Sequence, residues 1–111
     1  MEGKNILFVC AANVNRSITA QFWFSFLKPE NQYESAGSCP TACRIHGGKY
    51  VTKDQLDQAD RIICMDQRNK NELLNLFGET YSEKTECAGI KDRYLFLQLD
   101  LIWELVDKVK V

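Results

Sequence analysis

The stretch that decides the fold is residues 9–17, which read Val-Cys-Ala-Ala-Asn-Val-Asn-Arg-Ser. It joins an apolar run at residues 6–9 to a segment at residues 17–27 whose apolar spacing is helical. Four consecutive apolar residues are typical of a strand that is buried on both faces. The stretch therefore predicts a loop that leads from a buried strand into the N-terminus of a packed helix.

Such a loop is suited to bind an oxyanion such as phosphate. The first amides of a helix have no partner within it, and the helix dipole adds partial positive charge there. Arg16 supplies a planar, permanently charged group that can grip two phosphate oxygens. The expected phosphate-binding residues are Ala11, Ala12, Asn13, Val14, Asn15, Arg16 and Ser17.

Cys10 ends the predicted strand and is expected to face the bound anion. A thiol beside a helix N-terminus and an arginine has its pKa lowered, to roughly 3.5–7.5. A thiolate under a phosphoryl group is an in-line nucleophile, which implies transfer of phosphoryl to sulfur and then hydrolysis. The alternative is that Cys10 is only a small apolar residue at the end of a core strand.

The loop resembles the signature V-C-x-G-N-x-C-R-S-P of the low-molecular-weight protein tyrosine phosphatases. The nucleophile, asparagine, arginine and serine positions match in Cys10, Asn13, Arg16 and Ser17. Three departures replace the glycine, the second cysteine and the proline with Ala12, Asn15 and Ile18. A Cβ at position 12 would be strained if the loop needs a positive φ there, because glycine alone adopts it freely.

The resemblance continues beyond the loop. Residues 35–37 are similar to the family's S-A-G stretch, and residues 46–66 match its H-x-x-R-Q-[LI]-T…MD segment without a gap. Residues 90–94 lie where the family has [IV]-x-D-P-Y, with Arg93 in place of the proline. The connections on either side of residues 46–66 are shorter, so the chain resembles a compact member. The resemblance implies that Asp92 is the general acid.

The chemistry requires such an acid, because an aryl oxygen leaves far more readily when it is protonated, an effect of ~10²–10⁴ in rate. The residues alone do not select Asp92 from fifteen acidic residues. Asp60, Asp66 and Asp100 are equally suited to be helix caps or solvated carboxylates. With the resemblance, the expected catalytic residues are Cys10, Arg16 and Asp92.

Supporting roles are expected for residues that hold the loop in shape. Asn13 can adopt left-handed backbone and bond to nearby amides, and the resemblance links it to Ser35 and His46 in a hydrogen-bonded scaffold. Ser17 is expected to donate to the thiolate of Cys10 and to the departing sulfur. His46, the only histidine, is interpreted as structural support and not as a base.

Strand and helix patterns alternate along the whole chain, which predicts a parallel sheet with helices on both faces. We expect an α/β, three-layer α/β/α fold with about four strands, phosphatase I-like, as a single domain over residues 1–111. The expected strands are residues 6–9, 33–36, 61–65 and 86–88. The expected helices are residues 17–27, 52–58 capped by Thr52, a helix capped by Asp66 that ends at Phe77–Gly78, and a C-terminal helix.

Two apolar sets are expected to pack into the core. The C-terminal helix presents Leu99, Ile102, Trp103, Val106 and Val109 at helical spacing. The helix at residues 17–27 carries Phe22, Trp23, Phe24 and Phe26. Core packing is the favoured use of the aromatic residues, and self-association through an exposed Trp23 or Phe24 is the alternative.

Composition excludes several classes of protein. With 45% hydrophobic and 26% charged residues the chain is typical of a globular domain, and its net charge of -1 provides no basic field for nucleic acid. No signal peptide and no apolar stretch of ~18 residues is present, so we expect a cytoplasmic protein without a membrane partner.

The five cysteines are expected to be reduced thiols. Cys39 and Cys43 lack the further ligands of a zinc site, so we expect no metal and no cofactor. Many family members protect the nucleophile with the loop cysteine that Asn15 replaces. Cys39 or Cys43 is a candidate substitute partner for Cys10 on oxidation, against the simpler alternative of two unreactive thiols.

The expected substrate is a phosphotyrosine protein or a small aryl phosphate. By the resemblance, Val14 occupies the pocket wall, where tyrosine-directed members have isoleucine and arginine-phosphate members have threonine. One alternative function is that of an arsenate reductase of the same fold, which needs two further cysteines to relay a disulfide. Only Cys87 lies in the stretch where the reductases carry them, and we expect no cysteine near it. The other is a non-hydrolytic phosphate-binding or phosphocarrier module, which has no use for a proton donor such as Asp92.

Overall fold

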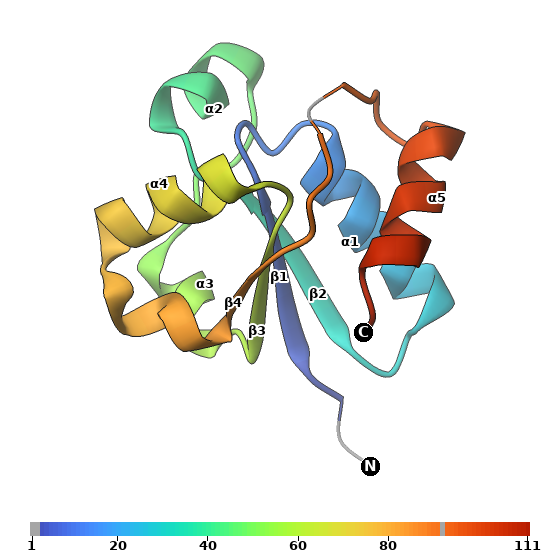
Figure 1. Ribbon diagram of the computed structural model, residues 1–111, viewed down its shortest axis with the longest axis horizontal. Helices are drawn as coiled ribbons and strands as arrows, with labels where there is room; N and C mark the ends of the chain where they lie inside the picture. The colour runs from blue at the N-terminus through green and yellow to red at the C-terminus, as the bar shows by residue number, and fades with distance from the viewer. Residues whose placement is uncertain (1–2, 92) are drawn as a thin grey trace.

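A parallel sheet of four strands forms the centre of the molecule, in the order β2-β1-β3-β4. The computed structural model describes residues 3–91 and 93–111 (Figure 1). The strands are β1 (Asn5–Cys10), β2 (Gln32–Gly37), β3 (Arg61–Cys64) and β4 (Thr85–Cys87). All four predicted strands are therefore confirmed, with small differences at their ends.

Helices cover both faces of this sheet, which confirms the predicted three-layer α/β/α fold (Figure 1). On one side lie α1 (Arg16–Leu27) and α5 (Leu99–Lys108). On the other side lie α2 (Pro40–His46), α3 (Lys53–Gln58), α4 (Gln67–Phe77) and the 3-10 helix η1 (Glu79–Lys84). The sequence did not predict α2 or η1, which are short and have little apolar periodicity.

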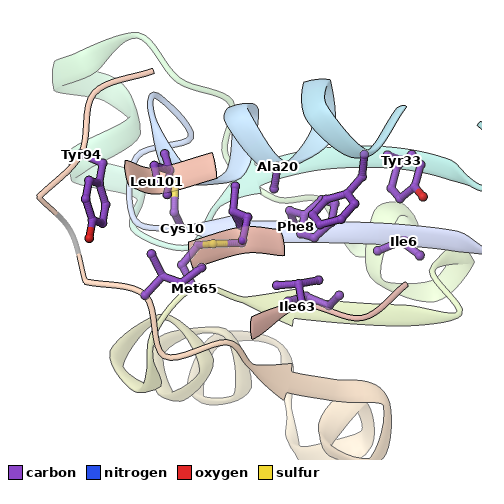
Figure 2. Packing of buried hydrophobic residues seen from close by; sticks show 13 residues of the cluster. Ile6, Phe8, Cys10, Ala20, Tyr33, Ile63, Met65, Tyr94 and Leu101 are labelled. Atoms are coloured by element: carbon purple, nitrogen blue, oxygen red, sulfur yellow. The ribbon is translucent and has the colours of Figure 1, made fainter. Parts of the chain in front are cut away.

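The side chains of β1 alternate between two apolar cores. Phe8 and Cys10 belong to the core beneath α1 and α5, whereas Leu7 and Val9 belong to the core beneath α3 and α4. Figure 2 shows Cys10 at the end of the first core, near Leu101 of α5. The thiol of Cys10 therefore lies on the α1/α5 side of the sheet.

Two predicted caps are confirmed and fix where α3 and α4 begin. The side chain of Thr52 accepts from Gln55 N–H, and that of Asp66 accepts from Asn69 N–H, each in a reciprocal capping box. A cap of this kind stabilises a helix by about 1 kcal/mol. The cap starts α4 immediately after β3, so Asp66 lies at the carboxyl end of the sheet.

The predicted apolar face of α5 is wrong in its main members. Leu101 and Leu105 are fully buried, whereas Leu99 is 81% and Trp103 is 78% exposed. Val109 is buried as expected and lies just beyond the helix. The helix carries two apolar stripes at helical spacing, and the sheet packs against the stripe that the prediction did not choose.

Polar contacts of α5 explain which of its two apolar stripes faces the sheet. Glu104 accepts a hydrogen bond from the Tyr94 hydroxyl, and Lys108 Nζ donates to the Gly89 carbonyl at 3.1 Å. Both partners lie in the segment that follows β4, so this edge of α5 is held against that segment. Leu101 then faces the sheet and Leu99 faces outward.

Among the α1 aromatic residues expected in the core, Phe24 is buried, at 2% exposure, and Trp23 is partly buried. Phe24 stacks with Phe8 of β1 at a ring-centroid distance of 5.7 Å. Phe22 is 57% and Phe26 is 75% exposed, so both contradict the core prediction. Because Phe24 is buried, it is also excluded as a contact for self-association.

Candidate functional site

The predicted phosphate loop connects the carboxyl end of β1 to the N-terminus of α1. Chain connections run in opposite directions from β1 and β3, and ligands of parallel α/β folds bind at such a switch point. A cavity of about 200 Å³ opens there. It is lined by Cys10, Ala11, Ala12, Val14, Asn15, Arg16 and His46.

The sulfur of Cys10 is buried and surrounded by hydrogen-bond donors. Asn13 N–H donates to Cys10 Sγ at 3.3 Å, and Ser17 Oγ lies 3.1 Å from the same sulfur. Ser17 Oγ also accepts from Asn13 Nδ2 at 2.8 Å, which leaves its own hydrogen for the sulfur. Both donors stabilise negative charge on Cys10.

Asn13 holds the loop from two sides. Its φ of 57° is left-handed, a conformation that asparagine tolerates better than most residues. Its side chain donates to Ser17 of α1 and accepts from Lys49 N–H at 3.2 Å. The loop is thus tied both to α1 and to the segment that follows α2.

The replacement of the family's glycine by Ala12 causes no backbone strain, because Ala12 is not among the described residues with positive φ. The glycine that the loop requires is Gly48 instead. A Cβ at Gly48 would lie 1.6 Å from the Ala12 carbonyl oxygen. Sequence reasoning missed this contact, for which the only signal is the Gly47-Gly48 pair.

Arg16 is buried and its orientation is fixed by two acceptors. Its Nη1 donates to Asp66 Oδ2 and to the Ile90 carbonyl, both at 2.8 Å. The first residue of α1 is therefore joined to the ends of β3 and of the segment after β4. The prediction found Asp66 only as a helix cap and missed its contact with Arg16, although its position directly after β3 was a signal.

The charge of Asp66 is favoured in this position. Burial raises the pKa of its carboxyl group, but hydrogen bonds from Arg16 and from Asn69 N–H outweigh burial, and the net pKa lies below its ordinary value of 3.8. A charged Asp66 balances the buried guanidinium and keeps it in place.

The predicted acid, Asp92, lies outside the described residues. On one side of it in the sequence, the Ile90 carbonyl contacts Arg16. On the other side, the Arg93 guanidinium donates to the Tyr94 hydroxyl at 2.9 Å and lies 5.1 Å from the centre of that ring. Ile90, two residues before Asp92 in the sequence, is thus bonded to the arginine of the phosphate loop.

The expected scaffold of Asn13, Ser35 and His46 is wrong with respect to Ser35. Ser35 Oγ donates to Gln21 Oε1 of α1, because Ser35 aligns with Phe8 and lies below the loop. His46 is the last residue of α2, and its exposed side chain lines the cavity. The partners of Asn13 are Ser17 and Lys49.

Cys39 and Cys43 lie beside the loop, as the sequence suggested. Cys39 N–H donates to the Ala11 carbonyl at 3.1 Å, and Cys43 Sγ donates to the same oxygen at 3.6 Å. Burial raises the pKa of the Cys43 thiol, and the neighbouring Cys10 and Cys39 raise it further. Their pairing with Cys10 on oxidation stays a prediction.

The other two cysteines adjoin each other. Cys87 aligns with Cys64 across β3 and β4, so the expectation that Cys87 has no near cysteine is wrong. Burial raises the pKa of Cys64 to about 12. Cys64 belongs to the core beneath α3 and α4, on the opposite face of the sheet from Cys10.

None of the helices within residues 3–91 and 93–111 is both long and apolar enough to cross a membrane. In the same part of the chain, no three His, Cys, Asp or Glu side chains are grouped so that they could hold a metal ion.

Solved structures with the same fold include tyrosine phosphatases. The Streptococcus pyogenes low-molecular-weight protein tyrosine phosphatase superposes with a TM-score of 0.75 at 20% identity, over 95% of this chain and 87% of that one. The Escherichia coli K30 tyrosine phosphatase Wzb, in complex with phosphate, gives 0.74 at 20% identity over 96% and 93%. Vibrio vulnificus Wzb, in complex with benzylphosphonate, gives 0.72 at 19% identity over 91% and 88%.

No protein-family model matches the chain, and no curated protein matches it in sequence. The structural matches establish that the chain has the fold that the resemblance implied.

Proposed function

We propose that this chain, which has the fold of the low-molecular-weight protein tyrosine phosphatases, is a single-domain member of that family that hydrolyses phosphotyrosine and other aryl phosphate monoesters. One observation carries the proposal. The Cys10 sulfur receives hydrogen bonds from the loop that also presents the fixed guanidinium of Arg16. The fold is shared with a phosphatase in complex with phosphate and another in complex with benzylphosphonate.

Phosphate binding is the first task of the site. The substrate's phosphoryl oxygens would accept from loop amides of residues 11–16 and from the guanidinium of Arg16. Asp66 and the Ile90 carbonyl hold that guanidinium through Nη1 before the substrate arrives. A donor that is already oriented costs little reorganisation in the transition state.

In the first chemical step, the Cys10 thiolate attacks phosphorus in line with the aryl oxygen. The S–P bond forms, the P–O bond breaks, and Asp92 donates a proton to the departing oxygen. The products of this step are a phenol, a phosphocysteine and the Asp92 carboxylate.

In the second step, Asp92 accepts a proton from a water molecule that attacks phosphorus. The P–O bond to water forms, the S–P bond breaks, and the electron pair returns to Cys10. Ser17 Oγ, 3.1 Å from the sulfur, donates to it as the negative charge reappears. Inorganic phosphate then leaves and the site returns to its starting state.

An aryl substrate is favoured by the apolar part of the cavity wall. Val14 lines the cavity and offers branched carbon, which packs against a ring, and no hydroxyl for a guanidinium. The partner we infer is a phosphotyrosine protein or a small aryl phosphate. A cytoplasmic location fits the five free thiols.

The two rival functions lack support in this arrangement. A reductase relay would have to pass a disulfide from Cys10 to Cys64 and Cys87, but Cys64 lies across the sheet. Burial raises the pKa of Cys64 to about 12, so it carries almost no thiolate at neutral pH. A phosphocarrier would be served poorly by Ser17, which assists loss of phosphate from sulfur.

The test combines a substrate comparison with two substitutions. The purified protein is given phosphotyrosine, phosphoserine and phosphoarginine peptides, and separately arsenate with a thiol reductant. We expect phosphate release chiefly from phosphotyrosine. Cys10→Ser is expected to abolish release while retaining phosphate binding, and Asp92→Ala to lower turnover by about 10²–10⁴.

Arsenite production without phosphate release would refute the proposal in favour of the reductase. A stable phosphorylated Cys10 in the wild-type protein would favour the carrier. Unchanged turnover in Asp92→Ala would show that the acid is a different residue.

A further inference from the structure

We propose that the outer face of α1 and α5 binds a second copy of this chain and forms a two-fold symmetric dimer. We define this α1/α5 face by the exposed apolar residues Phe22, Phe26, Phe96, Leu99, Trp103 and Val106. The sequence placed most of these residues in the core, and the structure brings them to the surface. The inference is independent of the phosphatase activity.

The six residues lie on two adjoining helices and on the turn before α5, and the exposed Asp100 and Asp107 are the charged neighbours of Trp103 on α5. On α1, Gln21 bonds to Tyr33 and Ser35 of β2, so Phe22 and Phe26 lie on the side nearer α5. Figure 1 shows α1 and α5 as neighbours in one layer, and the two helices are in contact.

On α5, Glu104 and Lys108 bond to the segment after β4. Leu99, Trp103 and Val106, at helical spacing, lie on the outward side of α5, away from the buried Leu101 and Leu105. The turn before α5 joins the two groups. Phe96 meets Phe22 edge to face at 6.3 Å between ring centroids, and Leu97 N–H donates to Thr19 Oγ1 at 2.9 Å.

The exposed apolar area matches what a homodimer needs. Phe22, Phe26, Phe96 and Trp103 are 57%, 75%, 45% and 78% exposed, equivalent to about two and a half whole aromatic side chains. At about 200 Å² for each ring residue, the face offers about 500 Å², before Leu99 and Val106 are added. A standard interface covers about 800 Å² per partner, of which about 65% is apolar in homodimers.

The part of the face on α1 offers an uncharged groove for an aromatic side chain. A groove of about 440 Å³ lies along α1 between Ile18 and Phe26, lined also by Gln21, Phe22 and Ser25, none of them charged. Trp103 is 78% exposed on the neighbouring helix α5. In a two-fold dimer, Trp103 of each copy fills the groove of the other, so one aromatic anchor is used twice.

The dimer leaves both catalytic cavities open. The residues of the α1/α5 face do not line the cavity at residues 10–16. We therefore expect the same activity per chain in the monomer and the dimer.

The experiment measures the mass of the 111-residue protein by sedimentation equilibrium over a dilution series from about 1 to 500 μM. We expect a monomer–dimer equilibrium with Kd in the micromolar range. Phe26→Glu and Trp103→Glu, tested separately, should each raise Kd by more than about tenfold, because every substitution occurs twice in the interface. Both side chains are largely exposed, so circular dichroism should show a folded protein.

The matched control is Leu76→Glu, which places the same charge at a 55% exposed leucine on α4 and should leave Kd unchanged. A wild-type protein that is monomeric over the whole series would overturn the proposal. So would a dimer that Leu76→Glu disrupts and Trp103→Glu does not. A monomer that sediments with phosphatidylcholine vesicles through Trp103 would assign the face to a membrane surface instead.

Discussion

Asp66→Asn is the substitution that most directly tests how the buried arginine is held. Asp66 Oδ2 accepts from Arg16 Nη1 at 2.8 Å, while Oδ1 accepts from Asn69 N–H and caps α4. Asparagine caps helices as well as aspartate does, so the substitution spares the helix while Oδ1 keeps its bond to Asn69 N–H. The amide nitrogen, which only donates, then replaces the oxygen that accepts from Arg16, so the substitution removes both the charge and the acceptor. Its effect therefore reports on Arg16.

The magnitude follows from the type of hydrogen bond that is lost. A hydrogen bond to a charged group contributes about 1.5–3 kcal/mol, and a neutral one about 0.5–1.5 kcal/mol. The guanidinium is 1% exposed and the carboxylate 25%, so solvent screens the pair only in part. The substitution removes the whole charged bond, so we expect kcat/KM for an aryl phosphate to fall by about 1.5–3 kcal/mol, which is about 12- to 160-fold.

Urea unfolding at neutral pH should show a loss of similar size in the free energy of unfolding. The matched control is Glu86→Gln, which neutralises the acceptor of Arg61 in an ion pair on the surface of the sheet edge. Its carboxylate is 48% exposed, so we expect unchanged kcat/KM and a loss below about 1 kcal/mol. If Asp66→Asn retains kcat/KM within about twofold, Asp66 does not orient Arg16.

Three further predictions concern the same loop. Ser17→Ala should slow the breakdown of phosphocysteine by about tenfold or more, and stopped-flow should then show a burst of phenol that the wild type lacks. If the variant and the wild type turn over at equal rates without a burst, Ser17 does not assist this step. Gly48→Ala should lower the free energy of unfolding by about 1–3 kcal/mol and weaken phosphate binding, because its Cβ meets the Ala12 carbonyl. Calorimetry that finds phosphate bound as tightly by the variant as by the wild type would contradict this prediction. The folded-state pKa of Asp66 is lowered, so its stabilisation is complete above its ordinary value of 3.8 and is lost as pH falls below it. The stability difference between wild type and Asp66→Asn should thus be constant over about pH 5–8 and shrink in acid, and a constant difference down to pH 2 would contradict it.

The strands and the phosphate loop could be predicted because local signals agree there. Residues 6–9 are continuously apolar, and Asp66 and Thr52 each form a cap with a partner three residues on. The rotation of α5 could not be predicted, because Leu101 and Leu105 compete with Leu99 and Trp103 at the same spacing. Only contacts far along the chain, such as that of Lys108 with Gly89, decide between the two stripes.

The candidate site also combines residues that the sequence identifies with contacts that it does not reveal. Cys10 and Arg16 are neighbours in sequence, so a motif identifies them together. The contact of Arg16 with Asp66 spans fifty residues, and the approach of Gly48 to Ala12 depends on how α2 is placed. The position of Asp66 after β3 and the Gly47-Gly48 pair are weak signals that do not name the partner, because each contact results from the packing of separate segments.

The left-handed backbone of Asn13 restricts which residues evolution can place there. Glycine would adopt the φ of 57° but would remove both side-chain bonds, and aspartate would add a negative charge beside a sulfur that must itself become negative. Alanine would lose the amide and also strain the chain. In a saturation library selected for activity, position 13 should return asparagine almost alone, whereas Ala11 and Val14 should accept several small or branched residues.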